Sequence, residues 1–283
     1  MPDLPIASAA LPIARDDMAA VARRALEVAR EKGASDAEVE VSAAVGQSVT
    51  VRRGEVETVE YNRDKGLGIT VYLGKRRGNA STSDLSQEAV ARTVEAACAI
   101  ARHTADDDAA GLPDADRLYR GEPPDLDLYH PWGLSVEEAI EVAKRTEAAA
   151  LAVDKRITNS EGATVSSYDT DFILANTRGF LAGFPNSKAS LGCGVVAEDA
   201  NGMQRDYWFS SERDPNRLES AESVGRTAGS RTVRRLGGRR IPTTEAPVLF
   251  EAGIAGSLVS HFVTAASGSM PVAGASTPGG SRP

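Results

Sequence analysis

Residues 37–83 read AEVEVSAAVGQSVTVRRGEVETVEYNRDKGLGITVYLGKRRGNASTS. Apolar and polar residues alternate along this stretch, which is typical of β-strands. The alternating segments are Ala37–Val45, Val49–Arg52, Val56–Tyr61, Gly68–Leu73 and Gly78–Ser83. Arg53-Gly54-Glu55 predicts a hairpin turn, and Gly74–Arg77 predicts a second one. The stretch therefore predicts an antiparallel sheet built from hairpins.

Helical patterns flank these strands on both sides. Asp16–Glu31 carries apolar residues at helical spacing, has acidic residues at its start and is followed by Gly33. After the strands, Ser86 is placed to cap a helix whose apolar face runs from Val90 to Ala101. Residues 16–101 thus predict a helix, an antiparallel sheet and a second helix.

The same order of elements recurs further along the chain. Ser135 and Glu138 have the spacing of a capping box at the start of another helix. Strand patterns follow, with Asn201-Gly202 as a strong hairpin signal, and a last helix is expected to open at Pro215. We therefore predict an α+β fold with two successive helix–antiparallel sheet–helix units, consistent with a duplication, followed by the start of a third domain.

The predicted units have the following boundaries. The chain divides into a first α+β unit at 1–111, a linker at 112–134, a second α+β unit at 135–241, the start of a C-terminal domain at 242–269 and a disordered tail at 270–283. The linker is rich in proline and acidic residues. The tail has low sequence complexity, which favours disorder.

Composition and charge indicate which partners and which cellular location to expect. The net charge is −8 over 283 residues, so a nucleic-acid partner is not expected. No apolar run reaches the roughly 18 residues of a membrane span, and the N-terminus lacks the basic and apolar regions of a signal peptide. The two cysteines, Cys98 and Cys193, lie in apolar segments and are expected to be buried free thiols. These features predict a cytoplasmic protein.

The three histidines are the first candidates for metal ligands. His103 ends a helix and His130 lies in the linker, and neither has Cys, Asp or Glu at ligand spacing. His261 lies in the apolar helical segment LVSHFVTAASG (258–268), but Phe262 follows it and Ala266 stands five residues on. A hydrolytic metal site needs further ligands and a general-base carboxylate. We therefore predict no catalytic, cofactor-binding or metal-binding residue in this chain.

Other reactive or charged groups have plainer interpretations. Gly192 and Gly194 around Cys193 indicate close backbone packing rather than a nucleophile. The acidic run 106–108 and the basic clusters at 75–77 and 234–240 are expected to be solvated turns. The nucleophile elbow, P-loop and dinucleotide fingerprint are absent from the sequence.

Four segments together resemble one known family. They are NSEGATVSSYDT (159–170), ANTRGFLAGFPNSKASLGCGV (175–195), VGRTAGSRTVRRLGGRRIPTTEAPVLFE (224–251) and LVSHFVTAASG (258–268). In order and spacing they resemble the TldD/PmbA family of two-subunit metalloproteases, also called modulators of DNA gyrase. The resemblance covers about residues 16–269. Within the family the chain looks like the PmbA (TldE) side.

The resemblance implies a role and a partner. The TldD side carries an HExxxH helix and holds zinc. His261 matches its first histidine, while Phe262 replaces the glutamate and Ala266 the second histidine. The implied function is a non-catalytic subunit of a heterodimer whose TldD-like partner binds the metal. The two subunits are thought to enclose a cavity for unfolded peptides.

The segment MPVAGASTPGGSRP (270–283) does not resemble the family's continuation, and a frameshift or truncated gene is the expected explanation.

Three alternatives stay open beside the subunit hypothesis. The chain could be a standalone peptide-binding or regulatory protein that uses exposed strand edges, a non-functional remnant, or an independent hydrolase.

Overall fold

The computed structural model describes residues 11–121 and 124–267. The predicted disordered tail, 270–283, lies outside the described residues. The chain forms two compact units, and the sequence boundary between them falls between Gly238 and Arg239. In chain order the elements are α1 (Arg15–Glu31), β1 (Asp36–Arg52), β2 (Glu55–Leu73), β3 (Arg76–Thr82), α2 (Gln87–His103), α3 (Val136–Leu151), β4 (Ile157–Asn176), β5 (Leu181–Ala182), β6 (Pro185–Asp199), β7 (Gly202–Glu212), a 3-10 turn (Pro215–Arg217), α4 (Ala221–Arg234) and α5 (Ala252–Ala266).

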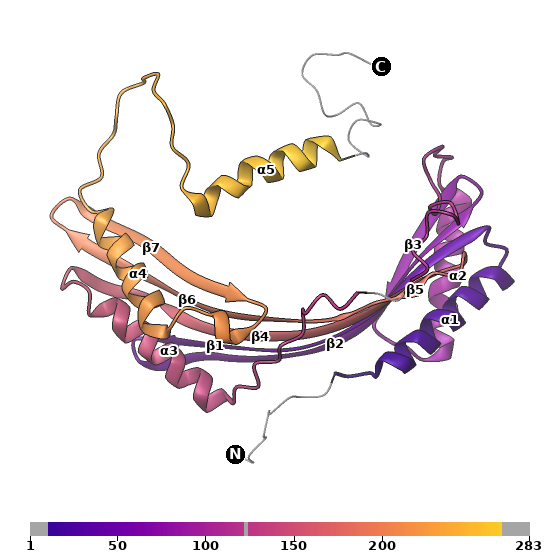
Figure 1. The fold of residues 1–283 in the computed structure, drawn as a ribbon, viewed down its shortest axis with the longest axis horizontal. Helices are drawn as coiled ribbons and strands as arrows, with labels where there is room; N and C mark the ends of the chain where they lie inside the picture. Colours follow the sequence, from indigo (N-terminus) through magenta and orange to yellow (C-terminus); the bar gives the residue numbers. More distant parts are fainter. Residues whose placement is uncertain (1–10, 122–123, 268–283) are drawn as a thin grey trace. The chain divides into compact units, whose positions relative to one another are not determined.

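The strands form one antiparallel sheet, and the predicted α+β class is confirmed. Its order is β3-β2-β1-β4-β6-β7, with β5 paired to β4. The sheet is continuous across both halves of the chain, because β1 pairs with β2 on one side and with β4 on the other. Figure 1 shows the long strands curving together along their length.

β1 is longer than the sequence pattern predicted. Ala37–Val45 and Val49–Arg52 were expected as separate strands, but residues 36–52 form one. Gly46 lies inside it because the ring of Tyr168 on β4 packs across that position. A Cβ at Gly46 would lie 2.3 Å from the ring. The glycine therefore makes room for a neighbouring aromatic side chain and does not end the strand.

The predicted turn between β1 and β2 forms at Arg53 and Gly54, with φ of +54° and +78°. Two successive residues at positive φ match the twist of a tight hairpin. The carboxylate of Glu147 on α3 accepts the backbone N–H groups of both residues, at 2.7 Å each. Glu147 is 1% exposed, so a buried carboxyl group from the second half of the chain holds a turn in the first half.

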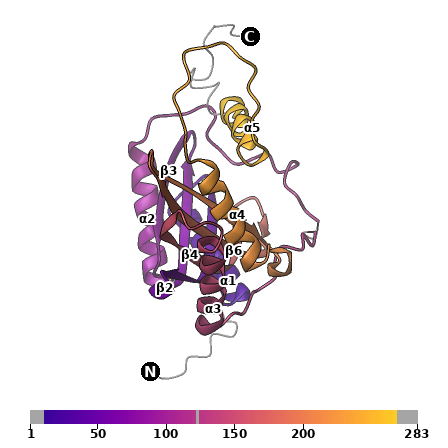
Figure 2. The same cartoon turned by 90° about the vertical axis from the view of Figure 1, so that its left-hand side faces the viewer.

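The four α-helices described in the first unit, α1 to α4, cover the same face of the sheet. Odd-numbered residues of β1 contact the helices at both ends of the strand, Val39 and Val41 near α1 and α2, and Val49 and Val51 near α3 and α4. We call these two groups the first core and the second core. Figure 1 shows the two helix pairs at opposite ends of the strands, and Figures 1 and 2 both show α3 and α4 side by side. The opposite face, called the open face below, is the concave side of the curved sheet in Figure 1.

The helix caps follow the sequence closely, with one difference. Ser86 caps α2, and Ser135 with Glu138 forms the predicted capping box of α3. The last helix of the first unit was expected to open at Pro215. That residue instead opens a 3-10 turn, and α4 begins at Ala221 with Ser220 as its cap. The hydroxyl of Ser220 accepts the N–H of Ser223, which supplies the missing partner at the helix start.

Candidate functional site

The helix α5, in the second unit, carries the residues aligned with the family's metal motif. His261, Phe262 and Ala266 are all exposed on it. α5 contains no aspartate or glutamate. Across residues 11–121 and 124–267, no group of three or more His, Cys, Asp or Glu side chains is placed to hold a metal. A single imidazole does not fit zinc, which takes three or four protein ligands.

The other two histidines lie on different segments of the first unit. His103 is exposed at the end of α2. His130 lies in the segment between α2 and α3, where its Nε2 is 3.1 Å from Asp127 Oδ1 and its backbone N–H donates to Ser187. The structure does not bring these side chains together into one site.

Both cysteines are free and buried, as predicted. Burial raises the pKa of Cys193 to about 12, and the charge of Glu147 adds to the rise. The thiol is therefore protonated at neutral pH, which is the wrong state for a nucleophile. Gly192 and Gly194 lie on the opposite face of β6, where an added Cβ would lie 3.3 Å from the Cβ of Phe209 and 3.1 Å from Glu161 Oε2 respectively.

The acidic run and the first basic cluster pair with each other at the surface. Lys75 donates to the carbonyl of Asp108 at 2.8 Å, and Arg76 lies 2.7 Å from the carboxylate of Asp106. In the second basic cluster, Arg235 lies 3.5 Å from Asp206. Arg239 and Arg240 are exposed. These contacts agree with the interpretation as solvated turns.

The open face is lined by small polar side chains, which the sequence analysis missed. They are Ser42, Ser48, Thr50, Thr164, Ser166, Thr170, Asn186 and Ser190 on β1, β4 and β6. Some of them form hydrogen bonds across strands, and the hydroxyl oxygens of Thr50 and Thr164 lie 2.9 Å apart. Tyr207 and Phe209 on β7 stack on the same face, with ring centroids 6.2 Å apart, and are 61% and 55% exposed. Serine and threonine at every second strand position are the signal that would have revealed this surface.

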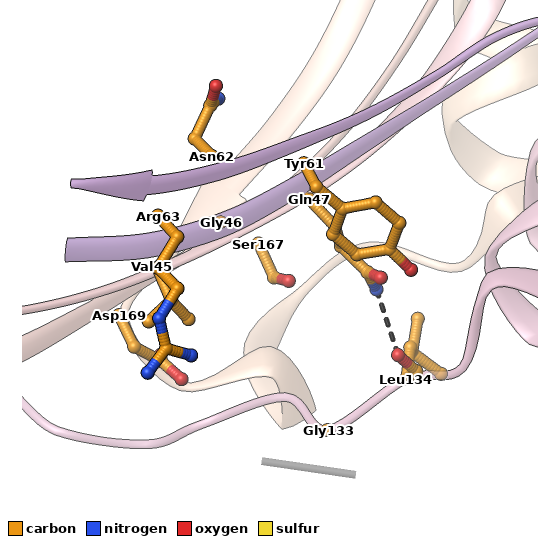
Figure 3. A pocket seen from close by; sticks show the side chains of 10 residues that line it. All are labelled: Val45, Gly46, Gln47, Tyr61, Asn62, Arg63, Gly133, Leu134, Ser167 and Asp169. Carbon is orange, nitrogen blue, oxygen red and sulfur yellow. Dashed lines mark hydrogen bonds between the residues drawn. The ribbon is translucent and has the colours of Figure 1, made fainter. Parts of the chain in front are cut away.

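A pocket opens on the helix-bearing face, midway between the two helix pairs. Tyr61 and Arg63 of β2, Gln47 of β1, and Ser167 and Asp169 of β4 line it (Figure 3). Gly133 and Leu134, just before α3, close one side. Its volume is about 190 Å³. Sequence analysis missed this pocket too, because its residues come from three strands and a connecting segment.

Two family models match the chain. One, the PmbA/TldA metallopeptidase domain 1, covers residues 37–101, and the other, the PmbA/TldA metallopeptidase central domain, covers residues 129–236. The helix-flanked sheet is therefore that of a metallopeptidase family. The chain is 46% identical over 245 residues to Metalloprotease PmbA of Escherichia coli O157:H7, and 42% identical over 244 residues to a PmbA homologue of Haemophilus influenzae. The chain belongs to the PmbA/TldD family.

The matches cover most of this chain but only part of its relatives. Each of these two alignments spans 86% of this chain and 54% of the relative, so the chain spans about half the length of the curated relatives it matches. A crystal structure from Bacteroides thetaiotaomicron, described as a modulator of DNA gyrase, aligns with a TM-score of 0.83 at 24% identity over 91% of this chain and 59% of that chain. TldE from Thermococcus kodakarensis aligns with a TM-score of 0.60 at 15% identity over 75% of this chain and 47% of that chain. Both structures share the fold.

Proposed function

We propose that this chain is a PmbA/TldE-like subunit of a TldD/PmbA-type metalloprotease and does not itself hold the metal. The observation that carries the proposal is α5, which has one histidine and no carboxylate. A hydrolytic zinc site lowers the pKa of a bound water and uses a nearby general base. Phe262, which replaces the motif's glutamate, cannot take a proton. Catalysis therefore requires a zinc-bearing, TldD-like partner subunit.

In this proposal the first unit contributes binding surface for an unfolded peptide. The small hydroxyl side chains of the open face offer donors and acceptors to a peptide main chain without selecting particular side chains. Tyr207 and Phe209 add exposed aromatic area to the same face. The net charge of −8 disfavours a nucleic-acid ligand.

We also propose a cytoplasmic location, on the strength of the two reduced cysteines and the bacterial relatives. Of the helices described, none has both the length and the apolar character that crossing a bilayer demands.

The test is reconstitution with a TldD-like subunit from the same genome. We expect cleavage of an unstructured, fluorophore-labelled casein peptide only when both chains are present, and loss of that cleavage on chelation. After dialysis the chain alone should contain no stoichiometric zinc, and His261→Ala should leave its metal content unchanged. Chelator-sensitive cleavage by this chain alone would overturn the proposal, as would bound zinc that His261→Ala removes.

One observation favours a second candidate, a standalone peptide-binding module. Residues 55–66 of β2 pair only with β1, because β3 begins to pair at Leu67. This leaves a strand edge whose backbone groups face no other described strand, beside the exposed side chains of Val56 and Val59. Extended peptides bind such edges by adding a strand. Micromolar binding of the casein peptide without any partner, abolished by Val59→Pro, would favour this role.

A further inference from the structure

The pocket in Figure 3 is built from two rows of side chains that cross β2, β1 and β4. One row is Arg63, Val45 and Asp169, and the other is Tyr61, Gln47 and Ser167. Directly opposed residues on neighbouring strands have Cβ atoms about 4.5–5.5 Å apart. The six side chains therefore form one compact patch, in the part of the sheet between the first and second cores.

Gln47 is the most unusual group in this patch, because it is a polar side chain only 5% exposed. Its Nε2 donates to the carbonyl of Leu134 at 2.8 Å, and this bond fixes the orientation of the amide. Its Oε1 is buried and accepts no hydrogen bond from residues 11–121 or 124–267. A buried acceptor without a donor is unfavourable, so the site is one donor short.

The pocket lining carries one carboxylate, Asp169, and one guanidinium, Arg63. Asp169 is half-buried, and within the described part of the chain it has neither a hydrogen-bond donor nor an ion-pair partner. Burial raises its pKa. Burial also raises the pKa of Tyr61, and the negative charge of Glu137 raises it further. The pKa of Tyr129 is raised in the same way by burial and by the charges of Asp169 and Asp171. A cation in the pocket would lie close to the Asp169 carboxylate, which lines it.

The two positive charges near the pocket, on Arg63 and Arg15, would repel a bound cation only weakly. Arg63 lines the pocket but is exposed, so solvent screens its charge. Arg15, the other nearby cation, is already paired to Asp171 through its Nε at 3.1 Å. Among the described residues, neither arginine forms an ion pair with Asp169, although Arg63 lines the same side of the pocket (Figure 3).

We propose that this pocket binds a primary ammonium group on a short alkyl chain. An ammonium has three donors, which match Gln47 Oε1, Ser167 Oγ and the Asp169 carboxylate. The alkyl chain would pack on Val45 and the ring of Tyr61, whose face also attracts cations. The volume of about 190 Å³ lies below the roughly 300 Å³ of pockets for drug-sized ligands, so it suits a lysine side chain or a small diamine.

Titrations of the isotope-labelled chain, followed by NMR, test this proposal. The probes are Nα-acetyl-lysine amide, 1,4-diaminobutane and butyrate. We expect the two amines to shift the amide signals of Gln47, Tyr61 and Ser167 at millimolar concentration, and butyrate to leave them unchanged. Tighter binding of the lysine derivative would identify a peptide side chain as the source of the ammonium, and tighter binding of the diamine would identify a free polyamine.

Matched variants decide whether Asp169 is responsible. Asp169→Asn should weaken amine binding about tenfold, because it removes the charge-assisted contact. The control, Asp64→Asn, removes a carboxylate on β2 that faces the open side and should change binding less than twofold. Thermal melts confirm that each variant is folded.

Three results of these titrations would overturn the proposal. They are equal shifts with butyrate, equal effects of the two Asp variants, and the absence of any shift with either amine. Arg63→Gln gives a further test, because Arg63 itself lines the pocket. Arg63→Gln removes the screened repulsion between the guanidinium and the bound ammonium, so it should strengthen amine binding about twofold. A gain of tenfold or more would show that Arg63 fills the site, and would also contradict the proposal.

Discussion

Single residues tie together segments that are distant in the sequence. Arg178, in the turn after β4, binds the carboxylate of Asp36 at the start of β1 through two contacts of 2.7 and 3.1 Å. It also donates to the carbonyl of Pro113, at 2.9 Å. Thr177 donates to the same Asp36 carboxylate at 3.0 Å. One arginine thus joins the first strand, a later turn and the segment between α2 and α3.

This cluster predicts a pH dependence of stability. The hydrogen bonds from Arg178 lower the pKa of Asp36, with Thr177 contributing. A carboxylate whose pKa is lower in the folded state stabilises the fold above its unfolded pKa, and the effect is lost as pH falls through the folded value. Asp36→Asn should therefore lower the free energy of unfolding by about 1–2 kcal/mol at pH 7. The difference from the native chain should shrink below about pH 4.

Urea denaturation between pH 3 and pH 7 measures this effect. Glu88→Gln is the control, because Glu88 forms an exposed helix pair with Arg92. Such surface pairs contribute little to stability. A constant difference between Asp36→Asn and the native chain across this pH range would contradict the prediction.

At the scale of elements, α3 and α4 pack so closely that their contact requires glycine. A Cβ at Gly225 would lie 2.1 Å from the carbonyl oxygen of Thr146, and one at Gly229 would lie 2.6 Å from that of Ala150. Such distances are far shorter than van der Waals contact. The backbones of the two helices meet directly at these positions.

We predict that Gly229→Ala destabilises the protein, although alanine is the better helix former. Alanine in place of glycine favours a helix by about 1 kcal/mol, whereas forcing extra volume into a packed contact costs about 1–3 kcal/mol. The backbone of α3 cannot move aside as a flexible side chain would. We therefore expect a lower melting temperature in thermal circular dichroism.

Gly256→Ala is the matched control on α5. A Cβ added at this position has no heavy atom within 4 Å apart from the backbone of its own helix. It should leave the melting temperature unchanged and raise the helical signal slightly. If both substitutions had the same effect, close packing of α3 on α4 could not be the cause.

At the scale of the whole first unit, one sheet carries two separate cores. The first core surrounds α1 and α2, and the second surrounds α3 and α4. The long strands β1 and β4 run through both. Local stability depends on the number of buried contacts. We therefore expect each helix pair to unfold together with its own core and independently of the other pair.

Hydrogen exchange by mass spectrometry can test this separation. Val94 and Val224 are fully buried, one in each core. Val224→Ala should cost about 1–3 kcal/mol and speed exchange in α3 and α4 more than in α1 and α2. Val94→Ala should do the reverse. Equal acceleration in all four helices would show instead that the two cores unfold as one cooperative unit.

Local sequence patterns predicted much of the secondary structure. The alternation in residues 37–83 and the turns at Arg53-Gly54 and Asn201-Gly202 indicated the hairpins, and Ser86 and Ser135 indicated two helix starts. These features depend on residues a few positions apart, so they can be read without knowledge of the fold. The predictions of a strand break near Gly46 and of a helix start at Pro215 were wrong. Each depends on another part of the chain, Gly46 on the ring of Tyr168 and the helix start on the cap at Ser220.

The strand order and the two polar surfaces depended on contacts that the sequence does not encode locally. Many segments of this chain alternate in the same way, so alternation cannot specify that β1 pairs with β4 across more than a hundred intervening residues. That pairing is set by long-range packing on the two helix pairs. It places Ser167 and Asp169 beside Gln47, and it aligns the hydroxyl side chains of the open face. The sequence therefore determined the elements and the family, whereas the folded sheet determined which polar side chains meet.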